Sequence, residues 1–176
     1  MSRDYSKVRP EFWTRGTGKG LRGDLEAQVV AMYLITGPAS HMTGLFYLPA
    51  PTLSHETGIP LEGALKALRS LSEGGFSRYD EESEHVFIPE MARFQIGENL
   101  SQRDNRHKAL VRELDGLRKS PFFNDFIEKY GEPYELKGLF AVQPLLRGLE
   151  APSNPLVSGF LGRRDPIAVS HRAIIG

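Results

Sequence analysis

Residues 44–89 constrain the fold of this chain more than any other stretch. The apolar run from Gly44 to Leu48 is too short for a helix and predicts a strand, and a short helix that ends at Gly58 follows it. A glycine between two helices lets the backbone adopt positive φ in the tight turn of a helix-turn-helix. The next helix is predicted over Leu61–Glu73, where apolar residues recur at i, i+3, i+4, i+7 and i+10.

Two short strands complete this pattern after Gly74 and Gly75. They are predicted at residues 76–79 and 85–88, and the acidic residues between them form the turn. A helix-turn-helix followed by such a hairpin is the element order of a winged helix-turn-helix. We therefore predict a mainly α fold with a small β wing, in which a C-terminal helical extension follows the winged helix-turn-helix.

Changes in composition along the chain predict four segments. The first is a basic arm and loop in which Phe12 and Trp13 dock on the core and a loop runs from Gly16 to Gly23. The last is a flexible tail rich in Pro, Ser, Asn and Gly. The boundaries are 1–23 for the arm and loop, 24–96 for the winged helix-turn-helix domain, 97–148 for the helical extension and 149–176 for the tail.

Three further helices are predicted outside the helix-turn-helix itself. Asp24 is a good N-cap for a helix that ends before Gly37, and the apolar density of this helix indicates that it is mostly buried. A helix is predicted over Leu100–Leu117. The short and very apolar helix over Phe122–Tyr130 must pack on something, and the simplest choices are the winged helix or a second subunit.

The net charge is zero, but the charges are segregated. Residues 1–23 carry six basic side chains against two acidic, residues 24–100 carry four against eleven, and residues 101–120 carry six against three. Such segregation bears on partners rather than on the fold. Cysteine is absent, which excludes disulfides and thiolate metal sites. The longest apolar stretch is too short to span a bilayer, and no apolar run near the N-terminus resembles a secretory signal, so a cytoplasmic protein without a membrane partner is predicted.

The outer face of the helix over Leu61–Glu73 is where a helix-turn-helix reads the major groove. Its DNA-binding candidates are Lys66, Arg69 and Ser70, and the alternative is a solvated helix face that contacts nothing. Two flanking segments offer candidate phosphate contacts, since lysine and arginine meet the DNA backbone. These contacts are Arg15, Lys19 and Arg22 in the arm, and Arg103 and Arg106 in the extension. The alternatives are an arm that is exchanged between subunits with Trp13 as its anchor, and an ordinary solvated amphipathic helix in the extension.

The predicted wing has the wrong charge for a phosphate contact. Asp80, Glu81, Glu82 and Glu84 would repel a DNA backbone, and Arg78 and His85 offset them only in part. The wing therefore either points away from nucleic acid or belongs to a module that binds protein.

No catalytic constellation stands out elsewhere. The run from Gly16 to Gly20 lacks the preceding strand and the hydroxyl residue after Lys19 that a phosphate-binding P-loop requires. The five histidines are scattered without metal-ligand spacing. The sequence predicts no enzyme activity, no cofactor and no metal site.

The run of motifs resembles the N-terminal winged-helix domain of phage and prophage replication proteins, which include replisome organisers and DnaD-like primosome components. The resemblance covers roughly residues 8–135 and implies DNA binding near a replication origin, oligomerisation and delivery of helicase or primase partners. It implies no catalytic residues. The matching residues are Phe12-Trp13, Met32–Thr36, Gly44–Pro49, Thr57-Gly58, Leu68, Leu71, Gly75-Phe76, Tyr79-Asp80, Val86–Pro89 and Met91–Ile96.

These observations lead to one hypothesis and two alternatives. We expect a non-enzymatic DNA-binding protein of prophage type that acts in replication initiation, with DNA as its main partner. Replication proteins or a second copy of the chain are further expected partners. The alternatives are a winged-helix protein-protein interaction or oligomerisation module that binds no DNA, and a small transcription regulator.

Overall fold

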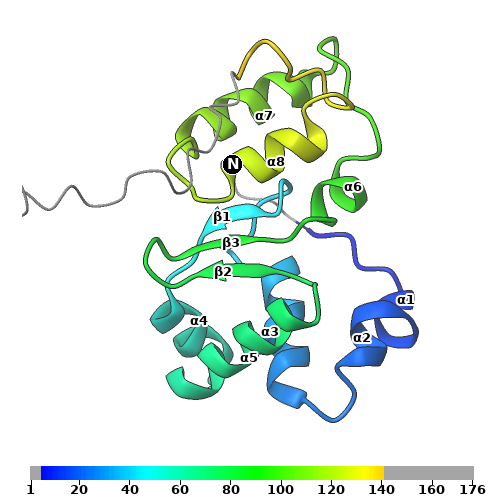
Figure 1. Ribbon diagram of the computed structural model, residues 1–176. Coiled ribbons are helices and arrows are strands. Elements are labelled where there is room, and N and C mark those ends of the chain that lie inside the picture. The colour runs from blue at the N-terminus through cyan, green and yellow to red at the C-terminus, as the bar shows by residue number, and fades with distance from the viewer. Residues whose placement is uncertain (1–4, 141–176) are drawn as a thin grey trace, which may run out of the picture. The chain divides into compact units, whose positions relative to one another are not determined.

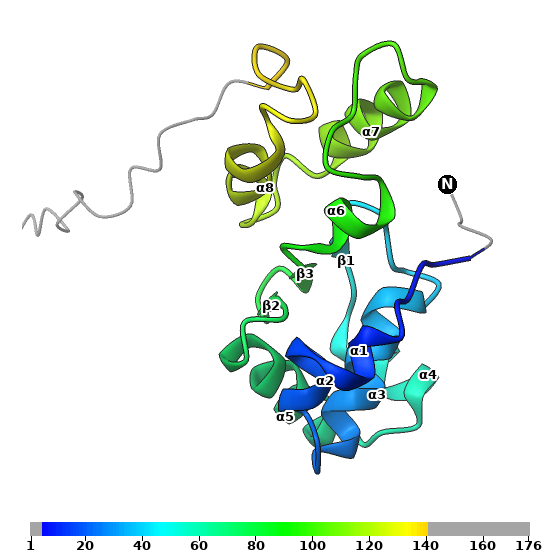
Figure 2. The ribbon, with the colours of Figure 1, turned by 90° about the vertical axis from the view of Figure 1, so that its right-hand side faces the viewer.

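Three helices and a three-stranded antiparallel sheet form the central part of the fold (Figures 1 and 2). The sheet order is β1-β3-β2. The strand β3 therefore lies between β2, its partner in the hairpin, and β1, which comes from before the helix-turn-helix. This arrangement confirms the predicted fold class, a mainly helical protein with a small β wing. The elements are α3 (Leu25–Thr36), β1 (Leu45–Tyr47), α4 (Ala50–Thr57), α5 (Leu61–Glu73), β2 (Arg78–Asp80) and β3 (His85–Phe87).

The computed structural model describes residues 5–140, which all belong to a unit spanning Met1–Gln143. The predicted flexible tail, residues 149–176, lies outside the described residues, as do the last residues of the predicted helical extension. Within residues 5–140, no helix combines the length and the apolar character that crossing a bilayer requires.

The turn between α4 and α5 is fixed by local chemistry. Gly58 ends α4 in the left-handed conformation, with φ 73°, which a residue with a side chain adopts at a cost. The Ser54 hydroxyl donates to the Ile59 carbonyl at 2.7 Å, and Pro60 precedes α5 with extended backbone. The predicted helix-turn-helix geometry therefore follows from residues close together in sequence.

The sheet is buried on both faces. Pairing of Leu45 with Phe87 and of Phe46 with Val86 places the two members of each pair on the same face, because side chains alternate along a strand. Phe46 and Val86 belong to a first core with Leu34 of α3 and with α4 and α5. Leu45 and Phe87 belong to a second core on the opposite face.

The second core is built by the helices that follow the wing. These are α6 (Met91–Gln95), α7 (Asn105–Gly116) and α8 (Phe123–Tyr130). Phe126 is fully buried, and its ring contacts the Phe87 ring of β3 edge-on, with centroids 6.4 Å apart. The apolar helix after Ser120 thus packs on the sheet of the winged helix in the same chain, which was the first of the two arrangements considered from sequence.

Three sequence-based expectations need correction. Part of the predicted glycine loop is helical, since α1 (Glu11–Thr14) is followed by α2 (Gly16–Gly20). The helix predicted from Leu100 begins at Asn105, because the Asp104 carboxylate accepts a hydrogen bond from the Arg106 amide and caps it. One side of α3 is exposed, although its apolar density indicated a mostly buried helix.

Candidate nucleic-acid interface

The outer face of α5 presents two of the three predicted DNA-binding residues. Lys66 and Arg69 are exposed, between the acidic residues Glu62 and Glu73 on the same helix. Ser70 is partly buried, and its hydroxyl donates to Asp24 Oδ2 at 3.2 Å. Asp24 also caps α3, because its Oδ1 accepts from the Ala27 amide at 3.0 Å. Ser70 therefore connects α5 to the start of α3.

Gly63 of α5 lies close to the start of α3. A Cβ atom at this position would lie 2.9 Å from a carboxylate oxygen of Glu26 and 3.0 Å from a methyl carbon of Ile59. Glycine leaves room for both side chains, and the hydrogen bond from Ser70 to Asp24 joins α5 to the cap of α3 at a second point. The start of α3 is thus held against α5.

The end of the basic N-terminal segment leads into this contact. Leu21 is buried in the first core, and its carbonyl accepts from the Gln28 side-chain amide at 2.7 Å. Arg22 stands between Leu21 and Asp24 and is exposed. Arg22 therefore stands two residues before Asp24, which contacts Ser70 of α5. Arg15 follows α1 and Lys19 lies in α2, and both are exposed. Figure 1 shows these two short helices on the same side of the sheet as α5.

The acidic wing turns toward α5. Arg69 Nη1 lies 3.7 Å from Glu81 Oε1, and both side chains are about 60% exposed, at 61% and 60%. A solvent-exposed pair of this kind contributes roughly 0–1 kcal/mol to stability. Its larger consequence is electrostatic, since Glu81 competes with phosphate for one of the two cations on the outer face of α5.

Arg78, the arginine of the wing, contacts α8 rather than α5. Arg78 Nη1 forms an ion pair with Asp125 Oδ2 of α8 at 2.6 Å, and the guanidinium lies over the Phe122 ring at 4.6 Å from its centroid. At the far end of β3, the Tyr47 hydroxyl donates to Glu84 Oε2 at 2.7 Å, which raises the pKa of Tyr47. Arg78 therefore serves the contact with α8.

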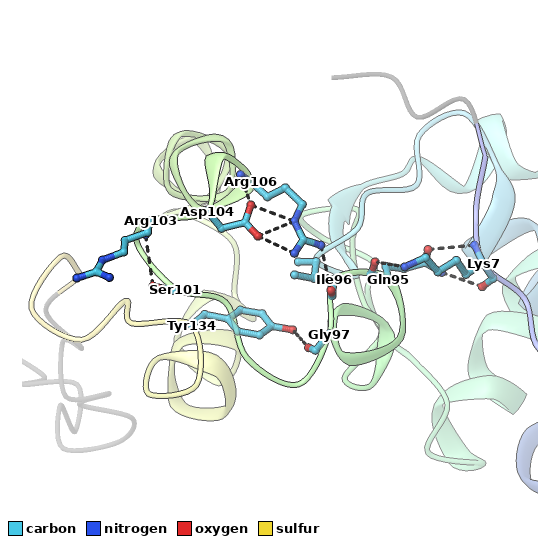
Figure 3. Close-up of polar contacts among 9 residues, drawn as sticks. All are labelled: Lys7, Gln95, Ile96, Gly97, Ser101, Arg103, Asp104, Arg106 and Tyr134. Atoms are coloured by element: carbon cyan, nitrogen blue, oxygen red, sulfur yellow. Dashed lines mark hydrogen bonds and ion pairs between the residues drawn. The ribbon is translucent and has the colours of Figure 1, made fainter.

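Arg106 has a structural role, since its guanidinium is engaged by partners within the chain (Figure 3). Its guanidinium donates to both carboxylate oxygens of Asp104, with distances of 2.7 to 3.1 Å, and to the Ile96 carbonyl at 3.1 Å. These hydrogen bonds join the start of α7 to the end of α6. Arg103 is exposed, and its backbone amide donates to Ser101 Oγ at 3.4 Å.

The first described residues lie along α6. The Lys7 amide donates to Gln95 Oε1 at 3.1 Å, Gln95 Nε2 donates to the Lys7 carbonyl at 2.9 Å, and Lys7 Nζ donates to the Gln95 carbonyl at 3.2 Å (Figure 3). Arg9 stacks over the Phe94 ring at 5.2 Å. Lys7 and Arg9 are thus engaged with α6 in this structure.

Replacement of Arg106 by alanine is expected to lower the melting temperature by a few degrees, while Arg103→Ala, three residues away, leaves it unchanged. The hydrogen bond from Arg106 lowers the pKa of Asp104 below its ordinary value of 3.8. A carboxylate with a lowered pKa in the folded state stabilises the protein above its unfolded pKa, and this contribution is lost as the pH falls through the folded pKa. The difference between wild type and Arg106→Ala should therefore shrink below about pH 4. Equal melting temperatures for wild type and Arg106→Ala at pH 7 would contradict this role.

The structure gathers some of the predicted residues and separates others. Lys66, Arg69 and Ser70 belong to α5, on the first-core side of the sheet, and Arg22 precedes by two residues the Asp24 that contacts Ser70. Arg103 and Arg106 belong to the segment that covers the second core, on the opposite side (Figure 1). The structural roles of Ser70 and Arg106 were missed from sequence. The Asp-x-Arg spacing at the start of α7 could have indicated the second role, whereas the partner of Ser70 is 46 residues away.

Comparisons of the chain with protein-family models, with curated proteins and with solved structures gave no match. The class of the fold follows from the geometry alone. It is a winged helix-turn-helix with a helical extension packed on its sheet. Among the described residues, no group of three or more His, Asp and Glu side chains is placed to hold a metal ion.

Proposed function

We propose that this chain is a non-enzymatic protein that binds duplex DNA, with α5 at the major groove and the segment from Arg15 to Arg22 along the phosphate backbone. The observation that supports the proposal is the Ser70–Asp24 hydrogen bond, which ties a residue just after this basic segment to α5. The resemblance to prophage replication proteins supports a role in replication initiation, and the winged helix alone would equally allow a small transcription regulator.

The distribution of charge explains why the flanking segment is needed. The helix that would enter the groove offers Lys66 and Arg69, and Glu81 already pairs with the second of these. Phosphate contacts provide most of the sequence-independent affinity of such proteins. Residues 11–22 carry three basic side chains and one acidic. They supply the positive charge that the winged helix lacks.

The test is a titration of a fluorescently labelled duplex, followed by anisotropy over a series of salt concentrations. We expect the logarithm of the affinity to fall linearly with the logarithm of the salt concentration, because bound lysine and arginine release counterions. Arg22→Glu should weaken binding and reduce the salt slope by about one. Absence of binding even at low salt would refute the proposal.

Arg112→Glu is the matched control for this experiment. Arg112 is exposed on α7, which covers the second core, and its replacement changes the net charge by the same amount as Arg22→Glu. If both variants lose affinity equally, the effect comes from total charge and the proposed surface is wrong.

The second candidate function is a protein-interaction module that does not touch DNA. The specific observation in its favour is the contact of Glu81 with Arg69, which places acidic charge next to the groove-reading helix. Glu81→Gln separates the two functions. A DNA-binding surface gains affinity when this carboxylate is neutralised, and a surface that serves only protein contacts still shows no duplex binding.

A further inference from the structure

The side chain of Gln95 holds Lys7 in the way that a neighbouring strand would. The Lys7 amide donates to Gln95 Oε1 at 3.1 Å, and Gln95 Nε2 donates to the Lys7 carbonyl at 2.9 Å (Figure 3). Facing residues of an antiparallel sheet exchange the same pair of hydrogen bonds, because the N–H and C=O of one extended residue point to one side. Gln95 therefore recognises the backbone of an extended segment.

Two further groups of α6 select basic side chains. Lys7 Nζ donates to the Gln95 carbonyl at 3.2 Å, and the last carbonyls of a helix lack an intrahelical donor and attract cations. Arg9 lies over the Phe94 ring at 5.2 Å from its centroid, and Phe94 is 46% exposed. An aromatic face likewise favours a cation. The side chains of Phe94 and Gln95 together with the Gln95 carbonyl, which we call the α6 peptide site, thus match an extended Lys-x-Arg segment.

The segment that occupies this site is held by contacts that a competitor can replace. The partners of Lys7 and Arg9 on α6 are uncharged, and within residues 5–140 neither cation forms an ion pair with a carboxylate. By contrast, Arg106, which donates to the Ile96 carbonyl at the same end of α6, is fixed by both carboxylate oxygens of Asp104. Lys7 and Arg9 are exposed, so their departure separates no charge pair and uncovers little apolar surface.

A second copy of this chain is a poor source of the competing segment. Exchange of residues 7–9 between two copies would replace each contact by an identical one and gain nothing. A tethered segment also competes at an effective concentration on the order of millimolar, which a free copy at lower concentration does not match. The competitor that fits these observations is a basic segment of a different protein.

We propose that the α6 peptide site binds an extended Lys-x-Arg segment of a partner protein, and that residues 7–9 block the site within their own chain until the partner displaces them. The inference goes beyond DNA binding and does not depend on it, because Phe94 and Gln95 belong neither to α5 nor to the segment from Arg15 to Arg22. The blocking segment lowers the apparent affinity for the partner, since only chains with an open site bind it.

The test is a titration of a fluorescently labelled peptide with the sequence of residues 5–10, Tyr-Ser-Lys-Val-Arg-Pro, followed by anisotropy. Two variants of the full chain break the same contact from opposite sides. Lys7→Pro removes the amide donor and the ammonium group from the blocking segment and leaves α6 intact, whereas Gln95→Ala removes the receptor. We expect Lys7→Pro to bind the peptide at least about tenfold more tightly than wild type, because the tethered competitor is lost. The double variant Lys7→Pro/Gln95→Ala should show no binding.

Gln102→Ala is the matched control for Gln95→Ala. The Gln102 carboxamide also donates to a backbone carbonyl, that of Glu135 at 3.3 Å, and it lies outside α6. In the Lys7→Pro background this substitution should leave peptide binding unchanged, and circular dichroism establishes that each variant is folded. A peptide with alanine in place of its lysine and arginine should bind more weakly. Failure of Lys7→Pro to bind the original peptide, or equal binding with and without Gln95, would overturn the proposal.

Discussion

Replacement of Phe126 by alanine is expected to lower the free energy of unfolding by about 3–5 kcal/mol. Phe126 is fully buried in the second core, where its ring contacts the rings of Phe87 and Tyr130 at centroid distances of 6.4 and 5.1 Å. Truncation removes these contacts and leaves a cavity that a closely packed core fills only in part. Denaturant unfolding followed by circular dichroism measures the loss.

The same substitution tests whether the two cores unfold together. Phe87 lies in β3, and its neighbour Val86 belongs to the first core, so loss of either core exposes the shared sheet. Trp13 packs on Phe12, which contacts the first core, and its fluorescence reports on that side. We expect the Trp13 transition to move to lower denaturant concentration in Phe126→Ala, together with the circular dichroism signal.

Leu139→Ala is the control for this experiment, since Leu139 is 47% exposed and its truncation should change stability by no more than about 0.5 kcal/mol. If the Trp13 transition of Phe126→Ala coincides with that of wild type, the two cores unfold independently. That result would contradict coupling of the winged helix to the helical extension through the sheet.

Replacement of Gly44 by alanine is expected to destabilise the protein by about 3 kcal/mol or more, because two costs add. Gly44 has φ 75°, which an alanine adopts at a cost of about 1–2 kcal/mol. A Cβ atom there would also lie 2.5 Å from the Ile88 carbonyl oxygen and 2.7 Å from Met91 Cβ. The Gly44 carbonyl accepts from the Ile88 amide at 2.8 Å, so the two segments cannot separate without loss of this hydrogen bond.

Gly75→Ala isolates the steric part of this effect. Gly75 has φ 70°, close to that of Gly44, and a Cβ atom there meets nothing within 4 Å. We expect Gly75→Ala to incur the conformational cost alone. Its free energy of unfolding, measured with denaturant, should therefore be clearly higher than that of Gly44→Ala. Equal losses would show that the segment around Ile88 and Met91 relaxes freely around the added methyl group.

Features that depend on neighbouring residues were predictable from the sequence. The turn at Gly58, the apolar face of α5 and the acidic hairpin each follow from periodicity or turn chemistry within a few residues. The candidate site was predictable only as a set of exposed cations. Two of these cations have partners that depend on how separate elements meet. Arg69 faces Glu81, and Arg106 is held by Asp104 and the Ile96 carbonyl.

Helix α3 shows why periodicity alone gave an incomplete answer about burial. An all-round apolar helix indicates burial, yet the pattern does not say how many neighbours cover it. One side of α3 packs against α5 and the sheet, and the side with Leu25 and Val29 is exposed.

The sequence by itself determined the order and type of the central elements, because helix and strand periodicities and glycine turns are local properties of the chain. Only the tertiary structure decided that the sheet is shared by two cores, that Ser70 bonds to Asp24 at the end of the basic segment, and that the segment with Arg103 lies across the sheet. These features come from contacts between residues far apart in sequence. Such contacts are set by which apolar surfaces can be buried against one another, which no local pattern specifies.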